Sequence, residues 1–251
     1  MDPSFAVAFG GGGARGLAHI HAIEALDELG IRPVAIAGSS IGAIMGAAMA
    51  SGMTGREIRA YAASILGRRT AIASRMWNAR PETFAEALQG GIKVSQFNIE
   101  RILKAFLPDR IPAAFEALQI PLKVTGTDYY GHSGAVFGAG APFPAPAASA
   151  PIPAVFRPVT RDGVLYIDGG IYNPVPFDQL RGAADIVVAV DVVGAPEPGS
   201  GERPNSLDLM FGATQLMMQS IIAGKLQQGH PDVLLRPPVS RFRVLDFMKI
   251  D

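Results

Sequence analysis

The first 52 residues contain two strand-like segments, each followed by a glycine-rich turn and a helical segment. The apolar segments SFAVAF (4–9) and VAIAG (34–38) have the composition of buried strands. Residues 17–30 then carry apolar side chains at helical spacing, and residues 41–52 are small residues that suit close packing on a sheet. Strands that alternate with helices favour a parallel sheet covered by helices, so we expect an α/β fold.

The remaining chain continues this alternation. The segments 122–130 and 134–140 are typical of two strands paired around a turn at 131–133. The pattern also predicts strands at 164–167, 185–193 and 232–237, a helix at 207–228, mainly helices over 54–118, and a proline-rich loop over 142–158. No boundary stands out, so we treat residues 1–251 as a single domain with a mainly parallel central sheet.

Composition excludes several function classes. The 22 basic and 22 acidic residues give a formal net charge of zero, which removes any chain-wide attraction to nucleic acid. The chain has no cysteine, so disulfides, thiolate catalysis and cysteine-bound metals are excluded. No His, Asp and Glu cluster has the spacing of a metal site. We therefore expect no metal, no cofactor and no nucleic-acid partner.

Neither candidate targeting segment has the required pattern. The N-terminal MDPSFAVAFGGGG lacks a basic region, and its apolar run is too short for a secretory signal. Residues 34–53 are apolar but interrupted by glycines and serines, which favours a strand and a helix over a membrane span. We expect a cytoplasmic protein with, at most, peripheral membrane contact.

The glycine loop after the first strand has two functional interpretations besides a simple tight turn, which four consecutive glycines make costly in conformational entropy. Gly11, Gly13 and Gly16 form G-x-G-x-x-G, which can place a pyrophosphate at a helix N-terminus. A dinucleotide site also needs an acidic residue at the end of the second strand, but this strand ends at Gly38-Ser39-Ser40. The other interpretation is a loop whose N–H groups bind the oxyanion of an acyl-transfer intermediate. The missing acid disfavours a dinucleotide-binding oxidoreductase.

Ser40 lies between Gly38 and Gly42 in a G-x-S-x-G pattern. This pattern marks either a nucleophile elbow or a helix whose first turn is capped by serine. The glycine loop and Ser40 each follow a predicted parallel strand, so both belong at the carboxyl edge of the sheet, where open α/β sheets bind ligands.

The base that a serine nucleophile needs is not obvious from the residues. Of His19, His21, His132 and His230, only the last suits the chain order of a hydrolase triad, and an ordinary surface or core-edge position explains all four. Asp168 follows a predicted strand and precedes two glycines. It is either a base or the start of a simple Asp-Gly turn, and the residues leave both open.

Three motifs together resemble the patatin-like phospholipases, especially their small bacterial members. They are GGGARG (11–16), GSSIG (38–42) and DGG (168–170). The connecting text GLAHIHAIEALDELGI, ASAPIPAVFRPV and DGGIYNPVP is also similar and occurs in the same order. The likeness extends from the first strand to at least residue 193.

The resemblance implies an open three-layer α/β/α fold and a serine acyl hydrolase that cleaves fatty acyl esters of phospholipids or related lipids. It implies that Ser40 is the nucleophile and Asp168 the base of a dyad without histidine, acting through an acyl-enzyme. The implied oxyanion loop comprises Gly11, Gly12, Gly13, Arg15 and Gly16, and the elbow and DGG motifs include Gly38, Gly42, Gly169 and Gly170. The alternative is a non-catalytic lipid-binding or regulatory relative.

Two segments are candidates for lipid contact. GRRTAIASRMWNARP (67–81) places four arginines around Met76 and Trp77, which suits an anionic bilayer or a solvated loop with the tryptophan turned inward. Met210, Met217 and Met218 in the helix at 207–228 suit either an acyl-chain lining or core packing. The oligomeric state stays open.

Overall fold

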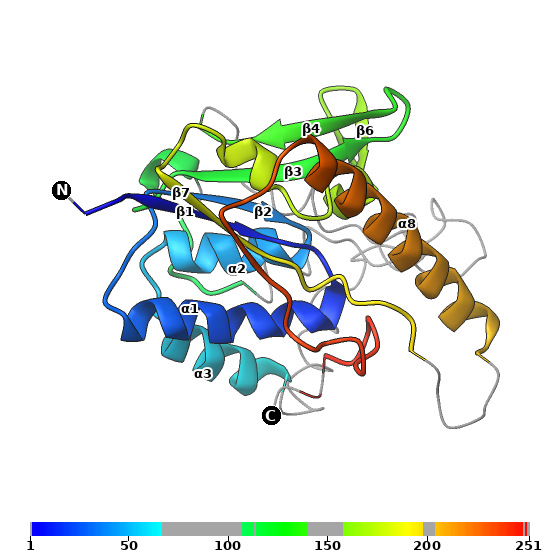
Figure 1. The fold of residues 1–251 in the computed structure, drawn as a ribbon, viewed down its shortest axis with the longest axis horizontal. Helices are drawn as coiled ribbons and strands as arrows, with labels where there is room; N and C mark the ends of the chain where they lie inside the picture. Colours follow the sequence, from blue (N-terminus) through cyan, green and yellow to red (C-terminus); the bar gives the residue numbers. More distant parts are fainter. Residues whose placement is uncertain are drawn as a thin grey trace, which may run out of the picture.

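The computed structural model describes residues 2–66, 107–112, 114–139, 158–197, 204–247 and 249. In these residues the strands form one eight-stranded mixed sheet with helices on both faces (Figure 1). The predicted α/β fold with a mostly parallel central sheet is confirmed. The segment 67–81, and all but the last residue of 142–158, lie outside the described residues.

The parallel part of the sheet has the order β3, β2, β1, β7, β8. Its strands are β1 (Phe5–Phe9), β2 (Ala35–Ser39), β3 (Leu122–Asp128), β7 (Ile186–Val190) and β8 (Val233–Leu235). Phe9 at the end of β1 pairs with Gly38 on one side and with Val190 on the other. The chain continues from β1 to β2 on one side and later places β7 on the other, so a topological switch point lies at the carboxyl end of β1.

Three antiparallel strands complete the sheet at β3. β4 (Ser133–Phe137) pairs along one edge of β3, and β6 (Val164–Ile167), which also pairs with β5 (Val159–Arg161), joins the opposite edge at Thr127 and Asp128. β2 occupies this second edge as far as Thr125. Because β2 runs parallel to β3 and β6 antiparallel to it, their carboxyl ends face each other along one edge.

Two layers of helices cover the sheet. On one face α2 (Ile41–Ala50) packs directly on the strands, and α1 (His19–Glu28) and α3 (Gly55–Leu66) complete the layer (Figure 1). A Cβ at Gly46 would lie only 3.0 Å from Ile36, so small residues allow this close approach. The opposite face is covered by η4 (Phe177–Leu180) and α8 (Ser206–Gln228). Val175, Phe177 and Leu180 of the η4 region and Ile222 of α8 are buried with strand residues such as Ala8 in one apolar cluster. The implied three-layer arrangement is confirmed.

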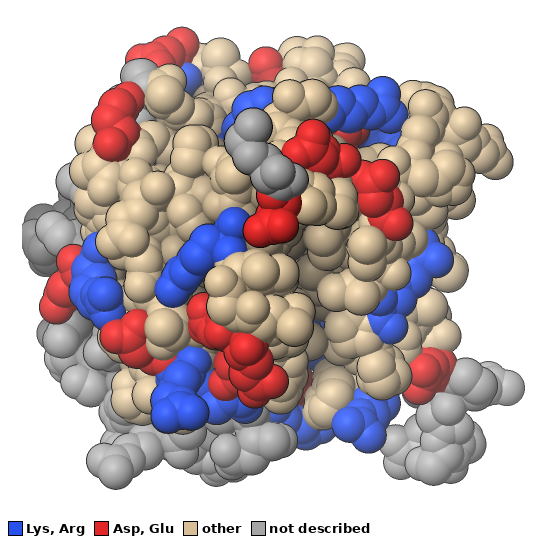
Figure 2. Space-filling model, turned by 60° about the vertical axis from the view of Figure 1, so that its left-hand side comes forward, with Lys and Arg blue, Asp and Glu red and all other residues tan. Residues whose placement is uncertain are grey.

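Short 3-10 helices lie at the loops that matter for the site. η1 (Gly13–Ala18) continues directly into α1, so the predicted helix at 17–30 begins earlier than its apolar spacing indicated. η3 (Gly169–Ile171) follows β6, and η2 (Phe115–Ala117) precedes β3. On the face in Figure 2, acidic and basic side chains are interspersed among uncharged ones.

Candidate active site

Ser40 lies at a sharp turn between β2 and α2. Its backbone has φ 53° and ψ −124°, a region that residues other than glycine rarely adopt. The turn needs glycine on both sides: a Cβ at Gly38 would lie 2.5 Å from the Ala43 Cα, and one at Gly42 would lie 2.2 Å from the Phe9 carbonyl oxygen. The Ser40 hydroxyl makes no capping hydrogen bond to α2. The geometry is therefore that of a strained strand–helix elbow rather than of a serine-capped helix.

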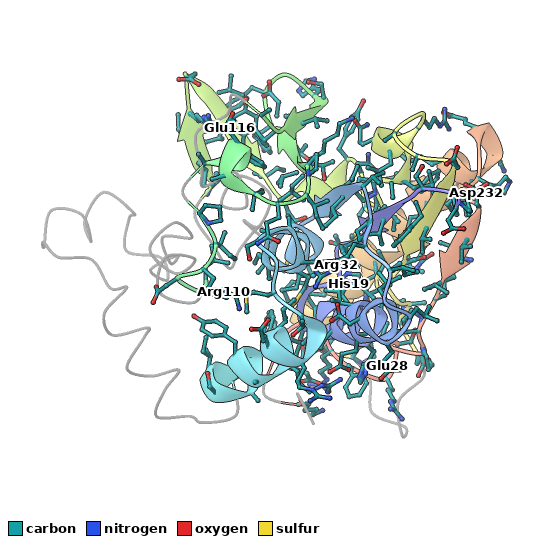
Figure 3. All side chains as sticks on the ribbon, turned by 90° about the vertical axis from the view of Figure 1, so that its left-hand side faces the viewer. His19, Glu28, Arg32, Arg110, Glu116 and Asp232 are labelled. Atoms are coloured by element: carbon teal, nitrogen blue, oxygen red, sulfur yellow. The ribbon has the colours of Figure 1, made fainter. Side chains whose placement is uncertain are left out.

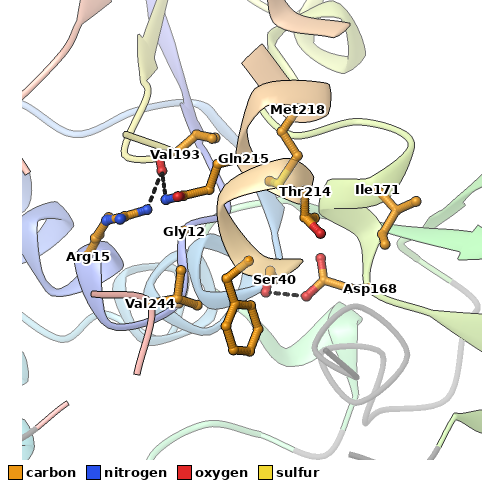
Figure 4. Close-up of a pocket in the computed structure, with 12 residues that line it drawn as sticks. Gly12, Arg15, Ser40, Asp168, Ile171, Val193, Thr214, Gln215, Met218 and Val244 are labelled. Carbon is orange, nitrogen blue, oxygen red and sulfur yellow. Dashed lines mark hydrogen bonds between the residues drawn. The ribbon is translucent and has the colours of Figure 1, made fainter. Parts of the chain in front are cut away.

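The Ser40 hydroxyl instead donates a hydrogen bond to Asp168, with 2.7 Å between Oγ and Oδ2 (Figure 4). The other carboxylate oxygen accepts from the Gly170 amide at 2.7 Å. The two residues meet because β2 and β6 end face to face on β3, and Asp168 directly follows β6. Gly169 is required next, since a Cβ there would lie 2.2 Å from the Thr125 carbonyl oxygen.

Burial changes the acidity of this carboxyl. Asp168 is buried, and this burial raises its pKa to about 6, although the hydrogen bonds from Ser40 and the Gly170 amide act in the opposite direction. A carboxylate with a pKa near neutrality is a stronger base than a free aspartate, because its conjugate acid holds the proton more tightly. The carboxyl is still ionised above pH 6, so at neutral pH it can accept a proton from Ser40.

The glycine loop beside Ser40 holds two amides without partners. The Gly10 and Gly11 amides donate to the carbonyl oxygens of Val190 and Pro174, both at 2.9 Å, and the Ala14 amide donates to Val244 at 2.8 Å. Between these contacts, no group in the described part of the chain accepts a hydrogen bond from the amides of Gly12 or Gly13. Both residues line the same pocket as Ser40 and Asp168. Two adjacent backbone amides in the lining of a pocket that holds a serine can serve as donors to an oxyanion.

The other residues of the implied oxyanion loop do not offer a free donor. The Gly11 amide donates to the Pro174 carbonyl oxygen, so Gly11 contributes the shape of the loop rather than an open amide. Arg15 is buried and donates from Nε to the Phe242 carbonyl and from Nη1 to the Val193 carbonyl, both at 2.7 Å. Gly16 packs against Ile41, where a Cβ would lie 2.1 Å from Cγ2. Arg15 and Gly16 therefore contact the residues that surround the loop, and their part in the proposed oxyanion site remains a prediction.

α8 forms one wall of the pocket. Gln215 donates to the same Val193 carbonyl as Arg15, which ties α8 to the glycine loop (Figure 4). Of the three candidate methionines only Met218 lines the pocket, whereas Met210 and Met217 are 41% and 61% exposed. The complete lining is Gly12, Gly13, Arg15, Ser40, Asp168, Ile171, Val193, Phe211, Thr214, Gln215, Met218 and Val244.

Several lining residues were not predicted from the sequence. Ile171 directly follows the DGG motif, and Val193 follows β7. Because open α/β sheets bind ligands at the ends of their strands, this position could have indicated both residues as candidates for the pocket lining. Phe211 and Thr214 lie on the predicted helix, but an apolar helix gives no indication of which face lines a pocket. Val244 lies in a C-terminal segment without a motif, and only the tertiary structure places it beside Gly13.

The four histidines all lie in the described residues, and none lines the pocket. His21, His132 and His230 are exposed, as expected for ordinary surface histidines. His19 is a correction, because it is fully buried rather than at the surface or core edge. The helical turn that begins at Gly13 rotates it beneath β1, where its ring packs against Phe9.

The fold and the site together define an α/β protein with a serine–carboxylate pair at the carboxyl edge of its sheet, beside two open amides. A family model described as patatin-like phospholipase matches residues 7–181. The chain belongs to this family, which confirms the resemblance seen in its three motifs. Because the chain belongs to the patatin-like phospholipase family, the glycine loop is not interpreted as a dinucleotide-binding loop.

Named relatives support this membership. The chain is 36% identical to an uncharacterized NTE family protein of Mycobacterium tuberculosis, over 81% of this chain and 53% of that protein. It is 28% identical to patatin-like phospholipase domain-containing protein 7 of Rattus norvegicus, over 99% of this chain and 20% of that protein. It thus spans about half or less of these relatives. Among solved structures, VipD from Legionella pneumophila matches with a TM-score of 0.46 and 16% identity, over 90% of this chain and 54% of that one.

Proposed function

We propose that this protein is a serine acyl hydrolase that cleaves fatty acyl esters of phospholipids or related lipids. The observation that carries the proposal is the 2.7 Å hydrogen bond from the Ser40 hydroxyl to Asp168. The same pocket is lined by Gly12 and Gly13, whose amides have no hydrogen-bond acceptor in the described part of the chain. A nucleophile, a base and oxyanion donors are the three parts that acyl transfer needs. Family membership supports an ester of a lipid as the substrate.

In the proposed mechanism, the Ser40 oxygen attacks the ester carbonyl carbon while Asp168 accepts the hydroxyl proton. The carbonyl oxygen becomes an oxyanion and accepts hydrogen bonds from the Gly12 and Gly13 amides. The carbon–oxygen bond to the alcohol then breaks, and Asp168 returns the proton to the departing alkoxide. Water, deprotonated by Asp168, attacks the acyl-enzyme, and the proton passes back to Ser40 as the fatty acid leaves.

The pocket walls support an apolar acyl group. Ile171, Val193, Phe211 and Met218 contribute apolar side chains around the serine. Residues 209–224 of α8 contain no charged side chain, and this span includes four of the twelve pocket-lining residues. Removing an acyl chain from water into such surroundings is favourable at about 0.8 kcal/mol per buried methylene. Among the described residues, no helix combines the length and apolarity needed to cross a bilayer.

Labelling with a fluorophosphonate tests the assignment of the nucleophile. We expect the probe to modify Ser40, because its hydroxyl is hydrogen-bonded to the proposed base and lines the same pocket as Gly12 and Gly13. Ser40→Ala should abolish labelling, as measured by peptide mass spectrometry.

Ser39→Ala is the matched control. Its hydroxyl is fully buried and has no hydrogen-bond partner in the described residues, so its loss should leave labelling intact. Continued labelling of the Ser40→Ala protein at any other serine would overturn the proposed nucleophile.

A further inference from the structure

We propose that His19 is a positioning residue for the glycine loop: its Nε2–H holds the Gly10 carbonyl and thereby orients the Gly12 and Gly13 amides. This inference rests on the proposed function, since it concerns the same oxyanion donors. It assigns a chemical task to a histidine that lies outside the pocket and takes no part in proton transfer.

His19 is the most deeply buried titratable side chain near the loop. Its exposed fraction is 0%, and Figure 3 labels its position relative to Glu28 and Asp232. Its Nε2 lies 2.8 Å from the Gly10 carbonyl oxygen. A carbonyl oxygen accepts, so Nε2 carries the hydrogen and Nδ1 carries none.

Packing alone does not explain an imidazole at this position. Nδ1 is a buried acceptor without a partner in the described residues. An unsatisfied buried polar atom is destabilising, and an aliphatic side chain would avoid this cost. Only the bond from Nε2 to Gly10 distinguishes the imidazole from an apolar residue here.

The peptide between Gly10 and Gly11 is held at both of its polar atoms. His19 binds its carbonyl oxygen, and its N–H donates to the Pro174 carbonyl at 2.9 Å. On the far side of the two open amides, the Ala14 amide is fixed to Val244 at 2.8 Å. Residues 10–13 are all glycine, so the backbone has little stiffness of its own. The orientation of the two open amides therefore depends on these two anchors.

The His19 bond also lies against the elbow. The Gly10 carbonyl oxygen is 2.6 Å from the position that a Cβ would take at Gly42, two residues after Ser40. The first turn of α2 thus packs directly on this carbonyl. Rotation of the Gly10–Gly11 peptide would disturb the oxyanion donors and the serine turn together.

The ring stays neutral while Asp168 titrates. Burial lowers the pKa of His19 to about 4, whereas that of Asp168 is raised to about 6. The imidazole therefore offers the same single hydrogen bond over the whole range in which the proposed base ionises. This separates a positioning role from a role in acid–base chemistry.

Three variants of the full chain test the inference. In His19→Gln the side-chain amide can reach the position of Nε2 and keep the bond to Gly10. In His19→Asn the amide reaches only as far as Nδ1, and His19→Leu fills the space without a donor. Turnover of p-nitrophenyl butyrate gives kcat and KM. A short-chain trifluoromethyl ketone, whose adduct with serine carries an oxyanion, reports directly on the oxyanion donors.

We expect kcat to fall about 10–100-fold in His19→Asn and His19→Leu, less than the 10²–10³-fold typical of losing a whole oxyanion donor. KM should stay nearly unchanged, and affinity for the ketone should fall in parallel with kcat. His19→Gln should retain most activity, and the pH midpoint of the active variants should not move. If His19 had a purely structural role, the variants would have a lower melting temperature, and they would not show a fall in kcat at constant KM.

Unchanged kcat and ketone affinity in folded His19→Asn and His19→Leu proteins would overturn the inference alone. A fall in kcat without a fall in ketone affinity would also overturn it. If His19→Leu does not fold, kcat and ketone affinity are compared between His19→Gln and His19→Asn, and equal values in these two variants would overturn the inference. A wild-type protein that neither hydrolyses esters nor reacts with a fluorophosphonate at Ser40 would overturn the proposed function, and this inference with it.

Discussion

At the scale of single residues, the proposed Ser40–Asp168 dyad would rely on burial, in place of an imidazole, to obtain a basic carboxylate. One carboxylate oxygen faces the hydroxyl and the other is fixed by the Gly170 amide, so the carboxylate has one orientation. Burial raises the pKa of Asp168 to about 6, which brings its basicity close to that of histidine. The pair is thus suited to proton transfer at neutral pH.

Asp168→Asn should remove the proposed base while preserving its shape. The amide cannot accept the Ser40 proton, so we expect kcat on a soluble ester to fall by about 10²–10⁴-fold, the usual contribution of a general base. The folded state should persist because asparagine is also common at turns beside glycine, which circular dichroism can confirm.

His230→Gln is the control for this variant, since only His230 suits a triad by chain order. It is exposed and absent from the pocket lining, so turnover should remain substantial. If His230→Gln abolishes turnover while Asp168→Asn retains it, the base is an imidazole and the proposed dyad is wrong.

The raised pKa of Asp168 predicts opposite effects of pH on rate and stability. As pH rises through about 6, the carboxylate forms and kcat/KM should increase with a midpoint there. The same ionisation is disfavoured by burial, so the stability that the neutral carboxyl provides below its unfolded pKa is lost as pH rises through the folded value. Relative to Asp168→Asn, the free energy of unfolding of the wild type should fall by about 3 kcal/mol between pH 3 and pH 8. Urea unfolding at the two pH values measures this difference, and an equal gap at both would contradict the raised pKa.

At the scale of secondary-structure elements, the site depends on how strand ends meet. β2 and β6 approach each other along one edge of β3, which brings the residues after them within hydrogen-bond distance. The start of α2 packs on the end of β1 with no space for a side chain at Gly42. The elbow is therefore held by strand pairing on one side and by backbone contact with β1 on the other.

Gly42→Ala should damage the elbow far more than a glycine substitution in an open turn. Its Cβ would lie 2.2 Å from the Phe9 carbonyl oxygen, so the helix must shift, and we expect a loss of about 3 kcal/mol or more in the free energy of unfolding. Gly30→Ala meets no atom within 4 Å, and its positive φ of 68° should cost only about 1–2 kcal/mol. Equal losses in chemical denaturation of the two proteins would show that the contact at Gly42 relaxes freely.

At the scale of the whole molecule, segments far apart in the chain converge on the switch point at β1. The loop after β7 contributes Val193, α8 contributes a wall, and the C-terminal segment contributes Val244 (Figure 4). Arg15 links these parts by binding the carbonyls of Val193 and Phe242. The candidate site therefore requires residues well beyond 7–181, the range that the family model matches.

We predict that the segment 67–81, which lies outside the described residues, binds anionic membrane surfaces. Four arginines surround Met76 and Trp77 in its sequence, so charge reversal at Arg68, Arg69 and Arg75 should weaken co-sedimentation with vesicles of anionic lipid. Added salt should weaken binding of the wild type in the same way, since it screens the charges. Matching sedimentation of both proteins at low salt would exclude this segment as the membrane contact.

Short-range chemistry in the sequence was enough to predict most of the elements. Buried strands, helix spacing and glycine-rich turns placed β1, β2, α2, β6, β7 and α8, and the three motifs indicated Ser40, Asp168 and the glycine loop. These signals are readable because each depends on residues within a few positions of one another. The roles of Ser40 as nucleophile and Asp168 as base remain predictions.

Only the tertiary structure decided which groups meet. Ser40 and Asp168 are 128 positions apart, and their contact depends on β2 and β6 sharing one edge of β3. The burial of His19, the occupied Gly11 amide and the approach of Val244 likewise depend on packing between distant segments. A sequence pattern specifies the local backbone, whereas pairing register and layer packing determine which distant side chains come within 3 Å of each other.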